Sequence, residues 1–382
     1  MKKIAVVTTS RAEYGHLICP LRAIRESPQL QLQLIVTGAH LSRRFGYTKD
    51  LIEADGFEID RQIETLVDSD SDVGMAKTIG TMSLGLTDAL ADLRPDLLLL
   101  IADRYEMLAP ASVALALRIP IAHIEGGEVS RGAVDDAVRN ALTKLSHLHF
   151  TTTELARERV ISMGEQPWRV IRSGAPSLDN LVGHDFADSK QLARTLGHEL
   201  PSSPVAVISM HPTTLADNTL EETGALFSAL QQFDDLGIIF CFPNADAGSR
   251  ELAEQASAFC LQRANAHLHT HIPHLDYLSL LKHADLMVGN SSSGIMESAS
   301  FKLPTVDIGR RQLGRERAEN VITCRAETDD IVNGIRKARD EAFRQSIRDV
   351  ENPYGDGRAS ERIVQVLTQL PDKQRLLDKV PT

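Results

Sequence analysis

The chain has 382 residues, 42% of them hydrophobic, which is too long for one ordinary domain and leaves ample material for two cores. The formal net charge of −11 is spread without a long basic block, so a nucleic-acid or anionic-membrane surface is not expected and small-molecule chemistry is favoured. The N-terminal apolar stretch is too short for a signal peptide, and no apolar run approaches the roughly 20 residues of a membrane span. We therefore expect a soluble, cytoplasmic protein.

The first half of the chain alternates short β-rich runs with longer helical patterns such as 14–26 and 106–117. Strands are predicted at 3–8, 31–37, 96–102, 119–124, 147–151 and 169–173. Strands that alternate with helices indicate βαβ units and a parallel sheet. This half of the chain is therefore predicted to be Rossmann-like.

A polar stretch near 183–203 precedes a second α/β pattern. Its strands are predicted at 205–209, 237–242, 267–272, 285–288, 305–308 and 320–324. The sequence thus predicts two Rossmann-like domains, 1–182 and 183–358, facing an interdomain cleft. An amphipathic C-terminal helix, at about 359–382, is expected to cross back onto the first domain, with the charged tail beyond Pro371 frayed.

Carboxylates crowd into one short stretch that follows two strongly apolar runs. They are Asp103, Glu125, Glu128, Asp135 and Asp136. Ligands of open α/β sheets bind beyond such strand ends, so acid/base chemistry is the first hypothesis. Glu125 lies between an apolar strand and a Gly-Gly turn, where partial desolvation raises the pKa of a carboxyl. A helix cap paired with Arg139 for Asp135, and a solvated loop charge for Glu128, remain alternatives.

Two strand-to-helix junctions are candidate phosphate sites. The first strand ends without a GxGxxG dinucleotide fingerprint, but Ser10 and Arg11 offer a hydroxyl and a guanidinium. The stretch 288–297, Val-Gly-Asn-Ser-Ser-Ser-Gly-Ile-Met-Glu, combines a glycine- and serine-rich turn with a helix start, which suits a diphosphate. Glu297, about one turn on, is placed to accept hydrogen bonds from ribose hydroxyls. Ordinary serine caps explain both junctions as well.

Histidines and arginines in the second half extend this hypothesis. His211 directly follows a predicted strand, where it could donate to a phosphate or move a proton, or serve as a structural hydrogen-bonding residue. Arginines 310, 311, 315 and 317 come just after the strand at 305–308. His267, His269 and His271 alternate and would share one face of a strand, a geometry that suits a metal or simply a polar strand face.

Several segments together resemble the hydrolysing UDP-N-acetylglucosamine 2-epimerases, both the bacterial sialic-acid-pathway enzymes and the epimerase half of the bifunctional animal epimerase/kinase. The resemblance spans about residues 1–362. It is carried by Ser-Arg-Ala-Glu-Tyr-Gly (10–15), Asp-Arg-Tyr-Glu (103–106), His-Ile-Glu-Gly-Gly-Glu-Val-Ser (123–130), Pro-Asn-Ala-Asp-Ala-Gly-Ser (243–249) and Gly-Asn-Ser-Ser-Ser-Gly (289–294). The joint order of these motifs is far more specific than any one of them.

The resemblance implies a GT-B fold and conversion of UDP-N-acetylglucosamine to N-acetylmannosamine and UDP, without nicotinamide or an obligatory metal. It implies no cofactor, a UDP-sugar as the small-molecule partner, and a homodimer or homotetramer. It also implies catalytic roles for Asp103, Glu125 and Asp135, with His211 beside them. UDP contacts are implied for Arg11, Arg104, His211, Asn244, Ser291, Ser292, Glu297 and Arg311.

Two positions depart from the family pattern. The family usually has glycine before the Asp-Arg pair, where this chain has Ala102. The loop between Ser130 and Asp135 is one residue longer than in the animal enzyme, so either Asp135 or Asp136 takes the catalytic place.

Three other activities remain possible from the sequence. A sister epimerase would act on UDP-2,4-diacetamido-2,4,6-trideoxyglucose. A GT-B glycosyltransferase would pass the sugar to an acceptor, with no deuterium uptake at C2. A non-catalytic nucleotide-binding module would bind UDP without turnover, but a mere binder has no need of so many carboxylates.

Overall fold

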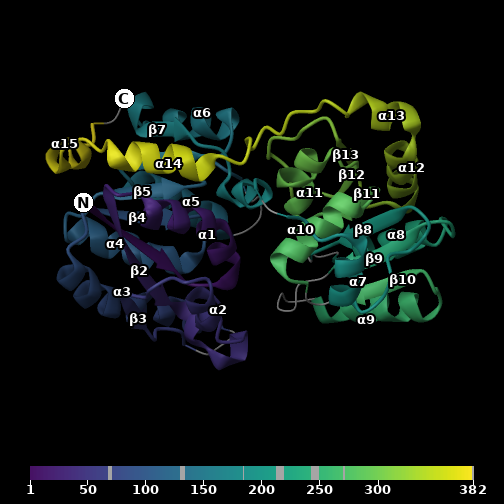
Figure 1. Ribbon diagram of the computed structural model, residues 1–382, viewed down its shortest axis with the longest axis horizontal. Coiled ribbons are helices and arrows are strands. Elements are labelled where there is room, and N and C mark those ends of the chain that lie inside the picture. The colour runs from purple at the N-terminus through teal and green to yellow at the C-terminus, as the bar shows by residue number, and fades with distance from the viewer. Residues whose placement is uncertain are drawn as a thin grey trace. The chain divides into compact units, whose positions relative to one another are not determined.

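The structure is a computed structural model that describes residues 1–67, 71–129, 134–183, 185–211, 219–241, 249–269 and 272–380. The chain divides into two compact units. The first unit holds Met1–Glu128, Val134–Val182 and Tyr354–Thr382, and the second holds Gly183–Pro353 together with Val129. Figure 1 shows that each unit is a sheet flanked by helices.

The first unit is built on a parallel sheet whose strands run in the order β3-β2-β1-β4-β5-β6-β7. The strands are β1 (Lys2–Thr8), β2 (Leu30–Thr37), β3 (Arg61–Ile63), β4 (Leu97–Ile101), β5 (Ile121–Ile124), β6 (Leu148–Thr151) and β7 (Val170–Arg172). The sequence missed only β3 among them, because this edge strand has three residues, two of them exposed. A short polar edge strand has no apolar run from which it could be predicted.

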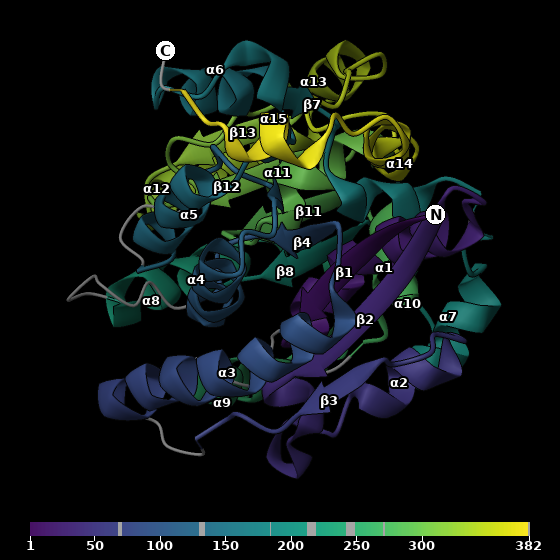
Figure 2. The same ribbon diagram turned by 90° about the vertical axis from the view of Figure 1, so that its left-hand side faces the viewer.

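The helices of the first unit cover both faces of that sheet, as Figure 2 shows. They are α1 (Arg11–Glu26), α2 (Lys49–Ala54), α3 (Asp72–Leu93), α4 (Leu108–Ala116), α5 (Val134–Leu145), α6 (Glu154–Ser162), α14 (Ala359–Thr368) and α15 (Lys373–Leu377). Along β4 the side chains alternate between two cores: Leu98 and Leu100 pack with α3, α4 and α5, whereas Leu99 packs with α1 and α14. Burial on both faces is why β4 consists of apolar residues alone.

The second unit repeats the architecture with the strand order β10-β9-β8-β11-β12-β13, again parallel. Its strands are β8 (Val205–Ser209), β9 (Gly237–Cys241), β10 (Ala266–His269), β11 (Leu286–Gly289), β12 (Thr305–Ile308) and β13 (Val321–Cys324). Its helices are α7 (Ser189–Leu196), α8 (Thr219–Leu230), α9 (Ser249–Leu261), α10 (His274–His283), α11 (Ser293–Met296), α12 (Thr328–Arg339) and α13 (Glu341–Ser346). Two parallel α/β units of this kind confirm the predicted fold class.

The last segment of the chain, yellow in Figure 1, belongs to the first unit. It forms two helices, α14 and α15, rather than one helix across 359–382. The Asp179 carboxylate accepts hydrogen bonds from the backbone N–H groups of Ala359 (2.8 Å) and Ser360 (2.6 Å) and thereby caps α14. At the other end of α14, the Lys2 ammonium donates to the carbonyl oxygens of Thr368 and Leu370. Within the described ranges, no helix is both long and apolar enough to cross a membrane.

The expectation that the tail frays beyond Pro371 is wrong. The Arg169 guanidinium, 1% exposed, donates to the carbonyl of His147 (3.1 Å) and to that of Leu376 in α15 (2.9 Å). The Lys379 ammonium donates to the Ser146 carbonyl at 2.7 Å. Ser146 and His147 lie between α5 and β6, and Arg169 directly precedes β7. The charged tail is therefore anchored by bonds to residues far away in the chain, which the sequence does not display.

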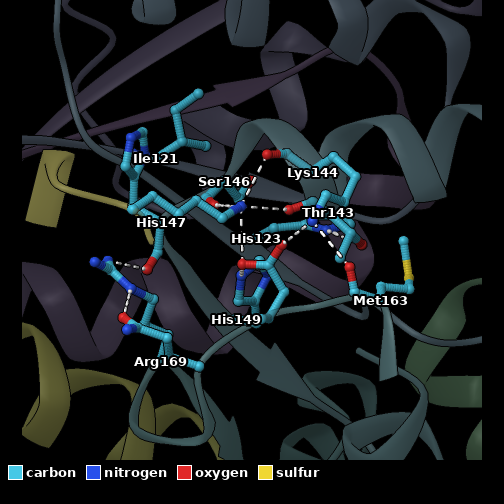
Figure 3. A network of polar contacts seen from close by, with 12 residues as sticks. Ile121, His123, Thr143, Lys144, Ser146, His147, His149, Met163 and Arg169 are labelled. Atoms are coloured by element: carbon cyan, nitrogen blue, oxygen red, sulfur yellow. Dashed lines mark hydrogen bonds and ion pairs between the residues drawn. The ribbon is translucent and has the colours of Figure 1, made fainter. Parts of the chain in front are cut away.

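A buried carboxylate, that of Glu165, lies at the centre of this anchor, and Figure 3 shows two of its partners, Lys144 and His149. It pairs with Lys144 of α5 (2.9 Å), with Lys379 of the tail (2.8 Å) and with His149 of β6 (3.2 Å). Burial alone would raise the pKa of the Glu165 carboxyl, but the hydrogen bonds from His149, Lys379 and Lys144 outweigh it and lower the pKa to about 2. The tail is therefore held by an ionised carboxylate.

We expect Glu165→Gln to lower the free energy of unfolding at pH 7 by about 3 kcal/mol, because the neutral amide no longer balances the charges of the partly buried Lys379 and the half-exposed Lys144. The pKa of this carboxyl is depressed in the folded state, so its contribution is complete above the unfolded value of 4.5 and is lost as the pH falls towards 2. Urea unfolding at pH 7 and pH 3 should show a smaller difference from wild type at pH 3. The matched control is Glu154→Gln, whose exposed carboxylate pairs only across a helix turn with Arg157. A pH-independent difference would contradict the assignment.

Candidate active site

Two neighbouring strands of the first unit end in residues with left-handed backbone. Ala102, after β4, has φ +62°, and Glu125, after β5, has φ +67°. The conformation is uncommon for residues other than glycine and costs roughly 1–2 kcal/mol. It turns the chain sharply where Asp103 and Glu125 leave the sheet. It also gives a physical reason why the family usually has glycine at the position of Ala102.

His123 supports the first of these turns from the next strand. Its side chain is fully buried, and its Nε2 lies 2.8 Å from the carbonyl oxygen of Ala102. Burial lowers the pKa of His123 to about 4, so the ring is neutral at pH 7. Since a carbonyl only accepts, the Nε2 carries the proton and donates it. The neutral imidazole therefore holds the backbone immediately before Asp103.

Arg139 of α5 links the carboxylate that follows β4 to a carboxylate of its own helix. Its guanidinium, 3% exposed, forms an ion pair with Asp103 and a longer one with Asp136, at 3.4 Å. Asp135 lies half-buried in the first turn of α5, and burial and the Asp103 charge raise the pKa of its carboxyl, although Arg139 and Arg104 oppose them. One alternative from the sequence was an ion pair between Asp135 and Arg139. The structure shows instead that Arg139 pairs with Asp103 and Asp136.

The other two carboxylates of the cluster have partners outside it. Glu125 is 7% exposed and its Oε1 lies 2.9 Å from Nδ1 of His16, on α1. Glu128 is also buried and accepts a hydrogen bond from the Thr152 hydroxyl, so it is not the solvated loop charge considered from sequence. His16 was missed in the sequence analysis, although it directly follows the motif at 10–15. Only the fold brings it to Glu125, which lies 109 positions away.

The β1–α1 junction holds a second charged group. Ser10 is the N-cap residue of α1, but its side chain makes no capping bond. The Glu13 carboxylate makes the bonds to the backbone at this helix start instead. Its Oε2 accepts from the backbone N–H of Thr9 (2.9 Å) and from the Thr9 hydroxyl (2.6 Å). Burial raises the pKa of the Glu13 carboxyl to about 7, although Arg104 and Thr9 act to lower it. Arg11 is exposed in the first turn of the helix.

Arg104 directly follows Asp103 and is already engaged with acids of its own unit. Its guanidinium pairs with the buried Glu106 carboxylate at 2.5 Å. Burial alone would lower the pKa of Arg104, but Glu106 and Glu13 outweigh it and raise the value, so the guanidinium stays charged.

In the second unit, Asn290 organises the proposed phosphate turn. It follows Gly289, whose φ is +141° and where a Cβ atom would lie 2.0 Å from the carbonyl oxygen of Ser209. The Asn290 side chain is bonded to both backbone groups of His211, accepting from its N–H (2.7 Å) and donating to its carbonyl (2.9 Å). The Asn290 backbone carbonyl accepts from Arg311 at 2.9 Å. Asn290 therefore brings His211 and Arg311 together.

Three more sequence candidates of this unit lie on the same turn or just after it. Ser291 is buried, Ser292 precedes the four-residue helix α11, and Glu297 follows it, 6% exposed. Burial raises the pKa of Tyr277 and the nearby Glu297 carboxylate raises it further, whereas its hydrogen bond with Ser293 acts to lower it. Tyr277 was missed from sequence, because nothing in α10 marks it as a neighbour of this turn.

Other candidates lie apart or outside the described ranges. Arg317 pairs with the buried Asp307 at 2.8 Å, a structural ion pair. His267 stacks on His198 with ring centroids 3.5 Å apart, and His198 Nε2 lies 2.9 Å from His269 Nε2. Asn244 and His271 fall outside the residues that the structure describes. In the described ranges, no group of three His, Cys, Asp or Glu side chains is arranged to hold a metal ion.

Comparison with known proteins identifies the family. The profile of UDP-N-acetylglucosamine 2-epimerases matches residues 22–368. The chain belongs to this family. It is therefore an epimerase-family enzyme, and the resemblance derived from its motifs is confirmed.

Curated relatives of this epimerase cover nearly all of it. The GDP/UDP-N,N'-diacetylbacillosamine 2-epimerase (hydrolyzing) of Campylobacter jejuni is 36% identical over 90% of this chain and 89% of its own length. The UDP-N,N'-diacetylbacillosamine 2-epimerase (hydrolyzing) of Legionella pneumophila is 35% identical over 99% of both chains. The UDP-N-acetylglucosamine 2-epimerase of Neisseria meningitidis serogroup B is 30% identical over 88% of both.

Solved structures confirm the GT-B-like fold of the epimerase. A UDP-GlcNAc 2-epimerase from Neisseria meningitidis, bound to UDP-GlcNAc, superposes with a TM-score of 0.83 at 18% identity over 97% of this chain and all of that one. The S. aureus MnaA–UDP structure gives 0.80 at 18% identity, over 97% of this chain and 96% of that one.

We expect Asn290→Ala to lower the free energy of unfolding of the epimerase by about 1–3 kcal/mol, because two backbone groups of His211 lose their partner. Guanidinium unfolding measures this difference. Asn333→Ala removes the same amide from an exposed position of α12 and should change stability by less than about 0.5 kcal/mol. Equal effects of the two substitutions would show that Asn290 does not organise the turn.

Proposed function

We propose that the protein is a hydrolysing 2-epimerase of a UDP-linked 2-acetamido sugar, releasing UDP and the free sugar with inverted C2. The arrangement of acids in the first unit supports this most directly. Asp103 and Asp136 pair with one guanidinium, that of Arg139, which also acts on Asp135 electrostatically, and Glu125 follows the adjacent strand. Several carboxyls in unlike environments are what a reaction with two proton transfers requires.

The first half of the reaction is an elimination. The C2 hydrogen is not acidic in the intact sugar, but it becomes removable once the C1–O bond to the diphosphate lengthens and positive charge develops at C1. That bond breaks with its electron pair going to UDP, a carboxylate takes the C2 proton, and a 2-acetamidoglycal remains. Cations and N–H donors aimed at the departing diphosphate lower the barrier to this step.

The second half is the reverse addition with water. A carboxylate directs water to C1, and an acid delivers a proton to C2 from the face opposite the one that lost it. We assign these proton transfers to Asp103, Glu125 and Asp135. The third proton-transferring carboxyl is assigned to Asp135 rather than to Asp136. The raised pKa of Asp135 suits a group that must hold a proton, whereas Asp136 is paired with Arg139.

The uridine diphosphate contacts are proposed from the family resemblance and the local geometry. In the second unit, Ser291, Ser292, Glu297, Arg311 and His211 share the turn that Asn290 organises. Arg11 and Arg104 are proposed to contact the diphosphate, as is Asn244, and His211 also to assist proton transfer. The first unit thus supplies the acids and the second most of the nucleotide contacts. The homodimer or homotetramer and the cytoplasmic location stay predictions.

UDP-N,N'-diacetylbacillosamine, which is UDP-2,4-diacetamido-2,4,6-trideoxyglucose, is the substrate that the relatives favour. Two hydrolysing epimerases with that activity are 36% and 35% identical to this chain, the second over 99% of both. UDP-N-acetylglucosamine is the alternative, which the Neisseria relative at 30% identity supports. The two sugars differ at C4 and C6, remote from the carboxylate chemistry at C1 and C2, so the same acids serve either.

We expect Asp103→Asn and Glu125→Gln each to lower kcat by about 10²–10⁴-fold, the range of a lost general acid or base. UDP release measured by a coupled assay reports kcat. Asp88→Asn, at an exposed position of α3, serves as the control and should retain wild-type turnover. Full turnover by either site variant would remove that residue from the mechanism.

Turnover in deuterated water should place one deuterium at C2 of the released sugar, with inverted configuration, because the proton delivered to C2 comes from solvent. NMR of the product, with each of the two UDP-sugars supplied in turn, measures both the chemistry and the preference. A sugar transferred to an acceptor with no deuterium at C2 would instead show a glycosyltransferase. UDP binding without any product would show a non-catalytic module.

A further inference from the structure

Glu13 is a buried acid for which the reaction proposed above has no use. It projects from α1, is 4% exposed, and has one carboxylate oxygen, Oε2, saturated by the two bonds from Thr9. The other oxygen, Oε1, is buried and has no hydrogen-bond partner among the residues that the structure describes. A buried carboxylate oxygen with no donor is costly when ionised, so some other interaction must balance this group.

The balancing charge is the Arg104 guanidinium, which acts on Glu13 electrostatically. Arg104 is at the same time ion-paired with Glu106, whose side chain is 1% exposed. Two buried acids therefore share one guanidinium, an excess of one negative charge when both are ionised. A single proton restores neutrality, and since Glu106 holds the guanidinium directly, Glu13 is the group that can accept that proton at the lower cost.

Among the residues that the structure describes, Arg104 is the one cation that acts on Glu13, and the other groups near this pair are uncharged. Thr9 and Ser10, at the end of β1, are neutral. Burial lowers the pKa of His40, which follows β2, to about 4, so its ring is uncharged at pH 7. Burial and the Glu106 charge raise the pKa of Tyr105, beside Arg104, so it too is neutral.

We propose that Glu13 is a proton-linked positioning residue: it shares the Arg104 guanidinium in the free protein and takes up a proton from solvent when a diphosphate engages that guanidinium. The proposal rests on the proposed function, because it takes Arg104 to be a diphosphate contact. An incoming diphosphate adds negative charge where two acids already compete for one cation. Protonation of Glu13 removes one of the two competing negative charges, so the Arg104 guanidinium is available to bind the diphosphate. The backbone that Glu13 caps through Thr9 does not have to move.

The linkage has a defined direction. In the free protein the pKa of Glu13 is about 7, and the bound anion raises it further. Binding therefore takes up roughly half a proton from Glu13 at pH 7. Between pH 6 and pH 8 the Kd of the wild type for UDP should therefore rise by a factor up to about tenfold larger than the Kd of a variant that lacks the Glu13 carboxyl.

Calorimetric titration of the full-length protein with UDP, in buffers of different ionisation enthalpy, measures the proton uptake. The wild type should take up more protons per UDP than Glu13→Gln, and its Kd should depend more steeply on pH. The comparison between proteins is decisive, because the terminal phosphate of UDP also titrates in this range. Asp179→Asn is the matched control, since it removes another buried carboxyl with a raised pKa, the one that caps α14, and should leave the wild-type uptake unchanged.

Equal proton uptake by wild type and Glu13→Gln would overturn the proposal while leaving the epimerase assignment standing. A wild-type protein that does not bind UDP would overturn both. Should Glu13→Gln fail to fold, infrared difference spectra of wild type, with and without 13C in its glutamate carboxyls, give the same answer. UDP added at pH 8 should produce the band of a protonated glutamic acid that shifts with the isotope, and its absence would refute the proposal.

Discussion

The site of the first unit depends on a backbone constraint at two neighbouring strand ends. Ala102 and Glu125 adopt a left-handed conformation that other residue types than glycine rarely occupy, and it persists only where surrounding bonds enforce it. The Ala102 N–H is bonded to Ile124, and its carbonyl accepts from His123. The turn is thus tied on both sides to β5. Without it, Asp103 would continue along the strand direction instead of turning to meet Arg139.

Charge balance around that turn sorts the carboxyls into different roles. Asp103 is paired with a guanidinium, whereas Asp135, close by on α5, is left with a raised pKa. The raised proton affinity of Asp135 suits a group that must hold a proton in a reaction that removes a proton on one face and adds one on the other. The same principle operates at Glu13 and Arg104, where two acids compete for one cation.

Helix α5 carries both residues of the proposed site and residues that stabilise the fold. Its first turn carries Asp135 and its middle carries Arg139, while its last turn carries Lys144, which is locked to Glu165 and the C-terminal tail. The tail therefore fixes the far end of the helix that presents the acids. In the second unit a single amide side chain, that of Asn290, holds the backbone of His211 in place through two hydrogen bonds.

The sequence by itself determined the α/β class, twelve of the strands, the family and the position of the acids at strand ends, because apolar runs and turn residues are local signals. It did not determine β3, the anchored tail, or the pairing of Glu125 with His16 and of Arg139 with Asp103. Those contacts join residues far apart in the chain, and a charged side chain looks the same in sequence whether it is solvated or paired. Only the tertiary structure decides which carboxyl receives which cation, since burial and the distance between charges, rather than residue type, set the proton affinity.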